Sequence, residues 1–497
     1  MAMRLKNLIY VMTAGCILAG CSLEEKPYGF YSGGNFYQSE DDAESALMYA
    51  YNALNYLEYL RGIWYVGDIP TDGMYPKSDE PGDIHHLENW TVNESTELTM
   101  YYFKYCFIGV NRANAVISKI GNGNFDKAVK EKVVGEALFL RAWNYFNLVR
   151  TFGLCPLYTE PITSLPQTTP AMAPSIQAIY ERIIADLTEA EQMLSVNKVF
   201  GRVDKVAVQA LLAKVWLHVA SSKDYGAPGY EDVTYDVESS YKAAADWARK
   251  VVNDYPGIYG FDENLRHIYD VYAPDGPEHI FIMAIDRSGT HEGMYSKIPL
   301  QFLPNNSSVP VFIKYSDGSL QMGNGNGWGV FLIGSDFVNK YQAIDKRRTE
   351  LIHRQIYNQD GSPVSPSPVR DYFTSKYVDP DFIGERTSAR PYLIRYSDIA
   401  LVLAEAAGPA EGYPLVNKIR ERAGIPPLAA GLSLEEFRRE VIAERALELA
   451  FEGNRLFDLR RTASVTSTKG TGADKMSEEE AAFYPIPQRE LDLNPNL

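Results

Sequence analysis

Apolar residues recur at helical spacing through most of the chain. A first helix is predicted from Ser39 onward, where Asp42 completes a pattern like a capping box, and Ser433 with Glu436 forms a second such box. The apolar positions of the first helix are Ala46, Leu47, Ala50, Leu54 and Leu57. The same spacing predicts helices at about 95–120, 126–151, 175–195, 204–222, 239–253, 391–407, 411–423 and 433–451. The fold class is therefore predicted to be mostly α.

Two stretches break this pattern. Residues 61–94 contain Pro70, Gly73, Pro76, Pro81 and Gly82, so we expect a long loop there. Residues 255–390 hold short β-like runs at 279–285 and 309–315, followed by a Gly/Asn-rich segment at 323–329. Irregular stretches of this length in a compact protein are usually functional or disordered.

Consecutive predicted helices joined by short turns suggest stacked helical hairpins, as in tetratricopeptide arrays. Small residues such as Ala207, Ala210 and Ala213 would let two helices approach closely. We therefore expect a single domain over residues 39–497. Its helical scaffold would span 39–254 and 391–461, with loop-rich ligand or partner regions at about 61–94 and 255–390.

The N-terminus has the pattern of a secretory signal. Arg4 and Lys6 precede an apolar run from Leu8 to Leu18, which is too short to span a bilayer comfortably as a permanent helix. Residues 1–20 are therefore predicted to be removed. No later stretch reaches the length of about 18 apolar residues that a spanning helix needs.

Small residues precede Cys21 in the sequence Leu18-Ala19-Gly20-Cys21, which resembles the lipobox of bacterial lipoproteins. This resemblance implies that Cys21 carries the lipid and that residues 21–38 form a lipidated tether to the outer membrane, facing the cell exterior. The alternative is an ordinary signal peptide with a chance cysteine. More than one acyl chain would make the anchoring stable.

The whole chain carries a formal net charge of −16 and has no basic run, which argues against nucleic-acid binding. After the signal, only Cys106 and Cys155 remain beside Cys21. Both lie in apolar sequence, which favours two buried thiols, although an exported protein could also form one disulfide. Their spacing is not that of a zinc site.

Five segments occur in an order that resembles the SusD/RagB family of outer-membrane nutrient-binding lipoproteins. They are Glu136–Leu157, Arg202–Leu217, Tyr392–Ala407, Val416–Gly424 and Glu444–Arg461, with a tail at Tyr484–Pro487 that also fits. The resemblance implies a tetratricopeptide-like helical scaffold whose loops hold the ligand. It implies an oligosaccharide ligand, or a peptide as the alternative, and a SusC-like TonB-dependent transporter as partner. It implies binding without catalysis or cofactor.

Three glutamates, Glu444, Glu448 and Glu452, recur every four residues and should share one helix face. Arginines lie near them in sequence, at Arg439, Arg445, Arg455 and Arg460. This pattern favours a salt-bridged scaffold over the pair of carboxylates in a cleft that a glycosidase needs. A surface hydrolase remains the least favoured alternative.

A polar cluster in the first loop region could ligate a metal, but a solvated loop is the favoured interpretation, and no metal is expected. Its members are Asp79, Glu80, Asp83, His85, His86 and Glu88.

Large aromatic residues in irregular, polar sequence are the candidate ligand contacts, because sugar rings stack on aromatic rings and their hydroxyls need polar partners. The candidates are Trp64, Tyr75, Asn89 and Trp90 in the first loop region, and Tyr315, Asn326 and Trp328 in the second. Some of these rings could instead anchor loops on the helices. Trp143, Trp216 and Trp247 lie inside helical patterns and are predicted to belong to the core.

Overall fold

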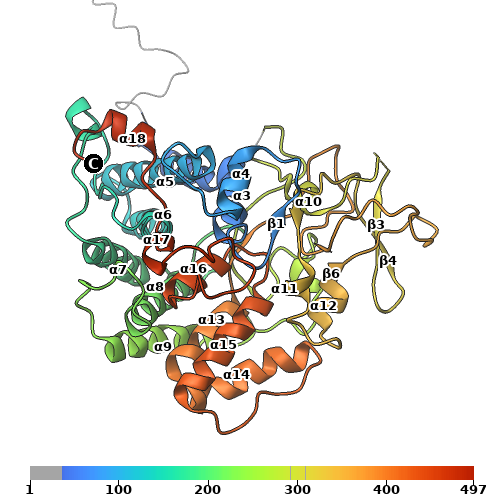
Figure 1. Ribbon diagram of the computed structural model, residues 1–497. Coiled ribbons are helices and arrows are strands. Elements are labelled where there is room, and N and C mark those ends of the chain that lie inside the picture. Colours follow the sequence, from blue (N-terminus) through green and yellow to red (C-terminus); the bar gives the residue numbers. More distant parts are fainter. Residues whose placement is uncertain (1–35, 292, 308) are drawn as a thin grey trace, which may run out of the picture.

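The computed structural model describes residues 36–497 except 292 and 308. The signal segment, Cys21 and the tether up to residue 35 lie outside the described residues. Figure 1 shows a large helical body, with most of the short strands and irregular connections gathered on one side of it. The predicted mostly helical fold is confirmed.

The helical body is built from elements that follow one another along the chain. They are α2 (Glu40–Asn52), α3 (Leu57–Gly67), α4 (Gly82–Glu88), α5 (Glu97–Gly121), α6 (Lys127–Phe152), α7 (Ile176–Met193), α8 (Lys205–Asp224) and α9 (Val237–Asn253). After the loop-rich middle come α13 (Tyr396–Ala407), α14 (Pro409–Arg422), α15 (Leu434–Glu448) and α16 (Arg455–Arg461). Helices α5 to α9 pack on their neighbours in chain order, and α13 then packs on α9 and α8. This is the stacked-hairpin arrangement that the sequence predicted.

Helix α6 lies at the centre of this body. Every residue from Val133 to Phe152 is buried, because α5, α7 and α2 enclose the helix. Both predicted capping boxes are present: Ser39 with Asp42 begins α2, and Ser433 with Glu436 begins α15. Each box supplies partners for backbone N–H groups that the first turn of a helix leaves unpaired.

The described residues contain four antiparallel pairs of short strands, most of them on the loop-rich side. The pairs are β1 (Tyr75–Pro76) with β5 (Phe331–Leu332), β2 (His279–Ile282) with β8 (Tyr392–Arg395), β3 (Val311–Lys314) with β4 (Leu320–Asn324), and β6 (Ile352–His353) with β7 (Phe373–Thr374). The β-like runs predicted at 279–285 and 309–315 contain β2 and β3. The pairing of β1 with β5 joins the two predicted loop regions.

Short helices complete the described chain. They are η1 (Ala53–Asn55), η2 (Leu165–Thr168), η3 (His267–Tyr269), α10 (Ile298–Phe302), α11 (Ser335–Val338), α12 (Lys346–Leu351), α17 (Glu478–Ala481) and α18 (Gln488–Leu493). Among the described residues, no helix is both long and apolar enough to cross a bilayer.

Three sequence predictions were wrong in detail. Residues 61–94 are not one long loop, because α3 continues to Gly67 and α4 lies within the stretch. The predicted helix at 391 begins with a strand, since Tyr392–Arg395 pairs with β2. The last predicted long helix ends at Glu448, and the chain then turns through Phe451, whose φ is 65°.

Cys106 and Cys155 are both buried thiols rather than halves of a disulfide, as their apolar surroundings suggested. Burial raises the pKa of Cys155 well above its ordinary value. Trp143 is buried, whereas Trp216 and Trp247 are half-buried and pack against the core.

Candidate functional site

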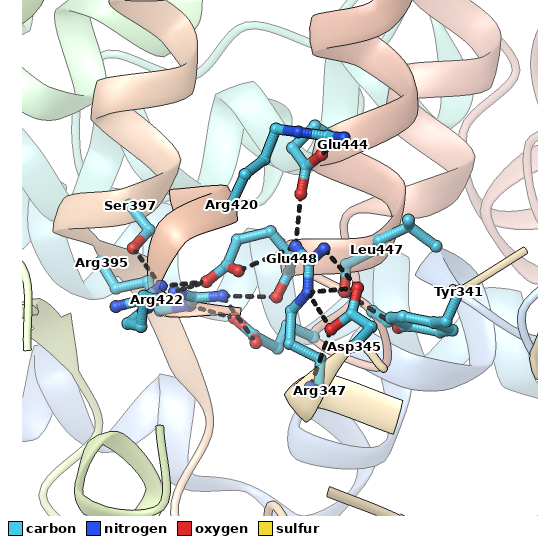
Figure 2. A network of polar contacts seen from close by, with 12 residues as sticks. Tyr341, Asp345, Arg347, Arg395, Ser397, Arg420, Arg422, Glu444, Leu447 and Glu448 are labelled. Carbon is cyan, nitrogen blue, oxygen red and sulfur yellow. Dashed lines mark hydrogen bonds and ion pairs between the residues drawn. The ribbon is translucent and has the colours of Figure 1, made fainter. Parts of the chain in front are cut away.

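Two groups of charged side chains bear on the candidate site, and the first is a closed cluster around α15. Arg395 at the end of β8 and Arg422 at the end of α14 both bind Oε1 of Glu448, at 2.8 and 2.7 Å. Arg347 reaches the other carboxylate oxygen, Oε2, at 3.3 Å. Figure 2 shows these guanidinium groups converging on Glu448 from separate parts of the chain.

Glu444 and Glu452, one turn either side, are paired in the same way. Glu444 accepts from Arg347 at 2.5 Å and from Arg420 at 2.7 Å (Figure 2). Glu452 accepts from Arg395 at 2.8 Å and from Lys376 at 2.7 Å. The predicted salt-bridged scaffold is therefore confirmed.

The predicted partners of these glutamates were wrong. Arg445 pairs with Asp398 and Asp458, Arg455 pairs with Asp72, and Arg439 pairs with Glu435, while Arg460 donates to backbone carbonyls. Helix periodicity places side chains on faces of their own helix, but it does not say which remote segment packs against each face.

The charges of this cluster, which we call the buried ion-pair cluster, set its electrostatics. Burial alone would raise the pKa of Glu448, but the positive charges of Arg422, Arg395 and Arg347 outweigh it and hold that pKa far below its ordinary value. All three glutamates are almost inaccessible and already carry cationic partners. They do not form the pair of carboxylates in an open cleft that glycoside hydrolysis requires.

The second group of charged side chains lines an open cavity of about 340 Å³ on the loop-rich side, which we call the Trp328 cavity. Its lining residues are Lys77, Asp79, Phe302, Pro304, Asn305, Trp328, Gly329, Leu332, Pro368, Val369, Arg370, Asp371 and Phe373. They come from four separate stretches of the chain. The β1–β5 pairing brings Lys77 and Asp79, just after β1, close to the segment that carries Trp328.

The local backbone fixes where Trp328 lies. The backbone N–H of Trp328 donates to the carbonyl of Leu300 at 2.6 Å, and the backbone N–H of Gly329 donates to the carbonyl of Leu303 at 2.9 Å. A Cβ at Gly327 would lie 1.7 Å from that Leu303 oxygen, so only glycine allows this approach. The Gly/Asn-rich sequence thus holds the half-buried indole at the wall of the cavity.

Charged groups of both signs line the cavity together with the indole. Arg370 contacts Asp79 at 3.0 Å, and Lys77 contacts Glu80 at 3.0 Å. The hydroxyl of Tyr75 donates to Asp371 at 2.7 Å, and burial together with this carboxylate raises the pKa of Tyr75 well above its ordinary value. The cavity wall thus has two cations and two carboxylates.

Three of the seven candidate contacts lie at or beside this cavity. Trp328 lines it, and Tyr75 reaches its wall through Asp371. Asn326, two residues before Trp328, is half-buried and its side-chain oxygen accepts from the N–H of Asn306 at 2.7 Å. The structure therefore brings together candidates from both loop regions.

The other four candidates lie elsewhere. Trp64 is 1% exposed and its indole N–H donates to the carbonyl of Phe451, while Trp90 is 8% exposed and donates to that of Pro70. These two indoles pack in the core. Asn89 is exposed outside the cavity lining.

Tyr315, the remaining candidate, lines a separate cavity of about 250 Å³. Its ring lies 4.5 Å from the guanidinium carbon of Arg266, and its hydroxyl donates to Gln321 at 2.9 Å. Burial raises the pKa of Tyr315 to about 12, so its hydroxyl remains a donor near neutral pH.

Sequence reasoning missed four polar residues of the Trp328 cavity: Lys77, Asn305, Arg370 and Asp371. A signal existed for Arg370 and Asp371, which directly follow a Pro/Ser-rich stretch in the irregular middle of the chain. The polar cluster at 79–88 does not gather around a point. His85 pairs with Glu88 at 2.7 Å, Asp83 accepts from the N–H of Glu97, and no three such side chains among the described residues are placed to hold a metal ion.

Comparison with known proteins shows which proteins the chain resembles. Residues 355–497 match a family model described as the SusD family, and residues 74–217 match one described as starch-binding associating with outer membrane. SusD-like protein P2 of Formosa agariphila is 25% identical over 525 residues, which cover 97% of this chain and 96% of that protein. Together these matches support a member of the SusD-like family.

Solved structures share the fold of this SusD-like protein. A SusD homolog from Bacteroides thetaiotaomicron superposes with a TM-score of 0.77 at 21% identity, covering 93% of this chain and 97% of that one. A laminarin binding SusD-like protein gives a TM-score of 0.75 at 22% identity, covering 91% and 97%. Proteins of the SusD-like family are binding proteins rather than enzymes. The resemblance noted in the sequence is confirmed.

Proposed function

We propose that this SusD-like protein captures neutral oligosaccharide in the Trp328 cavity, on the surface of the cell. The observation that carries the proposal is a half-buried indole at the wall of an open cavity whose polar groups are balanced in charge. The carbohydrate-related description of one matching family model and the laminarin-binding protein of the same fold support it.

The cavity chemistry suits a sugar. The face of Trp328 offers an apolar surface for the C–H groups of a pyranose ring. Asn305, Arg370 and Asp371 offer donors and acceptors for its hydroxyls. A cavity of about 340 Å³ falls in the range of small-ligand sites.

The balance of charges favours a neutral ligand over an ionic one. Arg370 already contacts Asp79, and Lys77 already contacts Glu80, so neither cation is left to attract an anion. The Arg370–Asp79 pair is exposed and of low net stabilisation, so sugar hydroxyls can displace it at little cost.

The remaining parts of the proposal concern location and delivery. A lipid on Cys21 would anchor the protein to the outer membrane, with the body facing the exterior. A SusC-like TonB-dependent transporter would then receive the ligand. The signal-like N-terminus and the family model described as associating with outer membrane support this arrangement.

The test is calorimetric titration of the purified protein with laminarin and starch oligosaccharides. We expect Trp328→Ala to lower the affinity for the bound glycan at least ten-fold, a loss of ~1.4 kcal/mol in binding free energy. Trp247→Ala is the matched control, because Trp247 is also half-buried but lies on α9, outside the cavity. Unchanged affinity in Trp328→Ala would contradict the assignment of the site.

Peptide capture by the same cavity is the alternative, and the charged wall gives it a basis. Its ligand would pair with Asp79 or Arg370 in place of their mutual contact. Binding of charged peptides that falls steeply with salt, together with no binding across a glycan panel, would favour peptides.

A further inference from the structure

A larger cavity, of about 750 Å³, lies in the helical body between α5, the segment 156–169 and the C-terminal residues 490–497. We call it the C-terminal cavity. It shares no lining residue with the Trp328 cavity. Figure 1 shows α5 and α18 on the left of the molecule, whereas β1 and α10, which flank the Trp328 cavity, lie to the right. The two cavities are therefore separate sites.

The walls of the C-terminal cavity are mainly apolar. Phe103, Phe107 and Val110 of α5 line it together with Ile162, Leu165 and Leu493. Leu165 is 82% exposed and Leu493 is 63% exposed. Large apolar side chains left in water around an apolar cavity are typical of a binding site.

Hydrogen bonds hold the walls in place, so the cavity is preformed. The buried side chain of Asn494 donates to the carbonyl of Pro170 at 2.7 Å, and Asn496 donates to that of Thr169 at 2.6 Å. The N–H of Ile162 donates to Asn111 of α5 at 3.2 Å. A ligand would not have to order these segments on binding, which favours affinity.

One carboxylate in this apolar wall is unpaired. Glu490 is half-buried, and no described residue donates a hydrogen bond to its carboxylate or forms an ion pair with it. Burial raises the pKa of Glu490, and its charge contributes to the raised pKa of the neighbouring Tyr158. Burying a carboxylate without a partner is unfavourable, and a cation in the cavity would offset that cost.

We propose that the C-terminal cavity binds a small amphipathic organic cation. The ammonium group of the ligand would contact the Glu490 carboxylate, and its apolar body would pack against Phe103 and Phe107. The faces of Phe107 and Tyr158 would add cation–π attraction. This site is independent of the glycan site proposed above.

Three probes of one shape test the role of charge: naphthylethylamine, which is cationic, naphthylethanol, which is neutral, and naphthylacetate, which is anionic. Each is titrated into the purified protein and followed by naphthalene fluorescence. We expect the amine to bind at least ten-fold tighter than the alcohol, and the acetate to bind more weakly than either.

Two variants then assign the site. Glu490→Gln should lower the affinity for the amine to that for the alcohol, because it removes the charge and keeps the shape. Glu479→Gln is the matched control, since Glu479 is exposed on α17 and does not line the cavity. Thr168→Trp, which places a large side chain at the cavity wall, should lower the affinity for the amine and for the alcohol alike. Circular dichroism of each variant confirms that it is folded.

Each contrary result overturns the proposal. Equal affinity for the amine and the alcohol would show a cavity indifferent to charge. An amine affinity that survives Glu490→Gln or Thr168→Trp would place its binding elsewhere. Absence of binding by all three probes would show that the cavity takes no such ligand. Laminarin should not compete with the amine, so the failure of either site is distinguishable from failure of the other.

Discussion

The buried ion-pair cluster and the Trp328 cavity use the same kinds of charged side chain in opposite settings. In the cluster, the side chains of Arg395 and Glu448 are each 1% exposed. In the cavity, Arg370 and Asp79 are 55% and 59% exposed, although their contact of 3.0 Å is almost as short. Contact distance alone therefore says little about what an ion pair contributes, and access to water decides it.

The comparison separates stability from binding. A buried cation that loses its partners cannot recover hydration, so removing one member of a buried pair is strongly destabilising. An exposed pair exchanges its partner for water at almost no net cost. The cluster should thus govern folding, and the cavity should be free to exchange its contacts for those of a ligand.

The largest effect is expected from Arg395→Met, which removes the cation shared by Glu278, Glu448 and Glu452. Three buried carboxylates would be left with fewer partners, so we expect a loss of ~3–5 kcal/mol in the free energy of unfolding. Urea denaturation followed by circular dichroism measures it. Arg439→Ala, which breaks an exposed pair with Glu435, is the control and should change stability by less than ~0.5 kcal/mol. Similar losses in both variants would contradict the comparison.

The second effect concerns pH and a buried acid without a cationic partner in direct contact. Burial raises the pKa of Asp68 to about 7, although the N–H of Gly453 donates to it at 2.7 Å. The folded state therefore keeps a proton that the unfolded chain loses above pH 3.8, so this residue's contribution to stability falls as pH rises from there to about 7. In Asp68→Asn that loss disappears. The free energy of unfolding of the variant should therefore rise relative to that of the wild type by about 1.4 kcal/mol per pH unit in that window.

Unfolding free energies measured at several pH values test this prediction, with the exposed Asp474→Asn as control. A constant difference between Asp68→Asn and wild type would contradict it. The stability that the buried ion-pair cluster contributes depends on pH with the opposite sign. The depressed pKa of Glu448 gives stability that is present above its ordinary pKa of 4.5 and is lost as pH falls below it.

The smallest effect on stability is expected in the cavity itself. Arg370→Ala removes an exposed partner of Asp79, so the free energy of unfolding should change by less than ~1 kcal/mol. If the cavity binds glycan, the same change should still weaken binding several-fold, because a hydroxyl partner is lost. Thermal denaturation and calorimetric titration of one preparation measure both. A large loss of stability without a change in affinity would reverse the roles assigned to the two regions.

The sequence was sufficient for most helices, because apolar spacing and capping boxes are local signals. It was insufficient where a remote segment decides the outcome. Trp64 and Trp90 lie among glycines and prolines, yet both indoles are buried, and the partner of Trp64 is the carbonyl of Phe451, far along the chain. The arginines that pair with Glu448 were missed for the same reason.

The site was partly predictable. Trp328 was found because a large ring in Gly/Asn-rich sequence is conspicuous, and Tyr75 because it lies in the first irregular region. Asn305 carries no such signal: it reaches the cavity only because strand pairing and the turn at Gly327 bring its segment together with the others. Common polar residues become recognisable as a site only once the chain is folded.

The enclosure of α6 has a consequence for how the protein opens. Since every side chain from Val133 to Phe152 is buried beneath other helices, its amide protons can exchange with deuterium only when the whole body comes apart. The amides of the β3–β4 hairpin, on the loop-rich side, need only a local opening. Deuterium uptake by α6 would thus report the global free energy of unfolding, while uptake by the hairpin would report local unfolding of the loop-rich side.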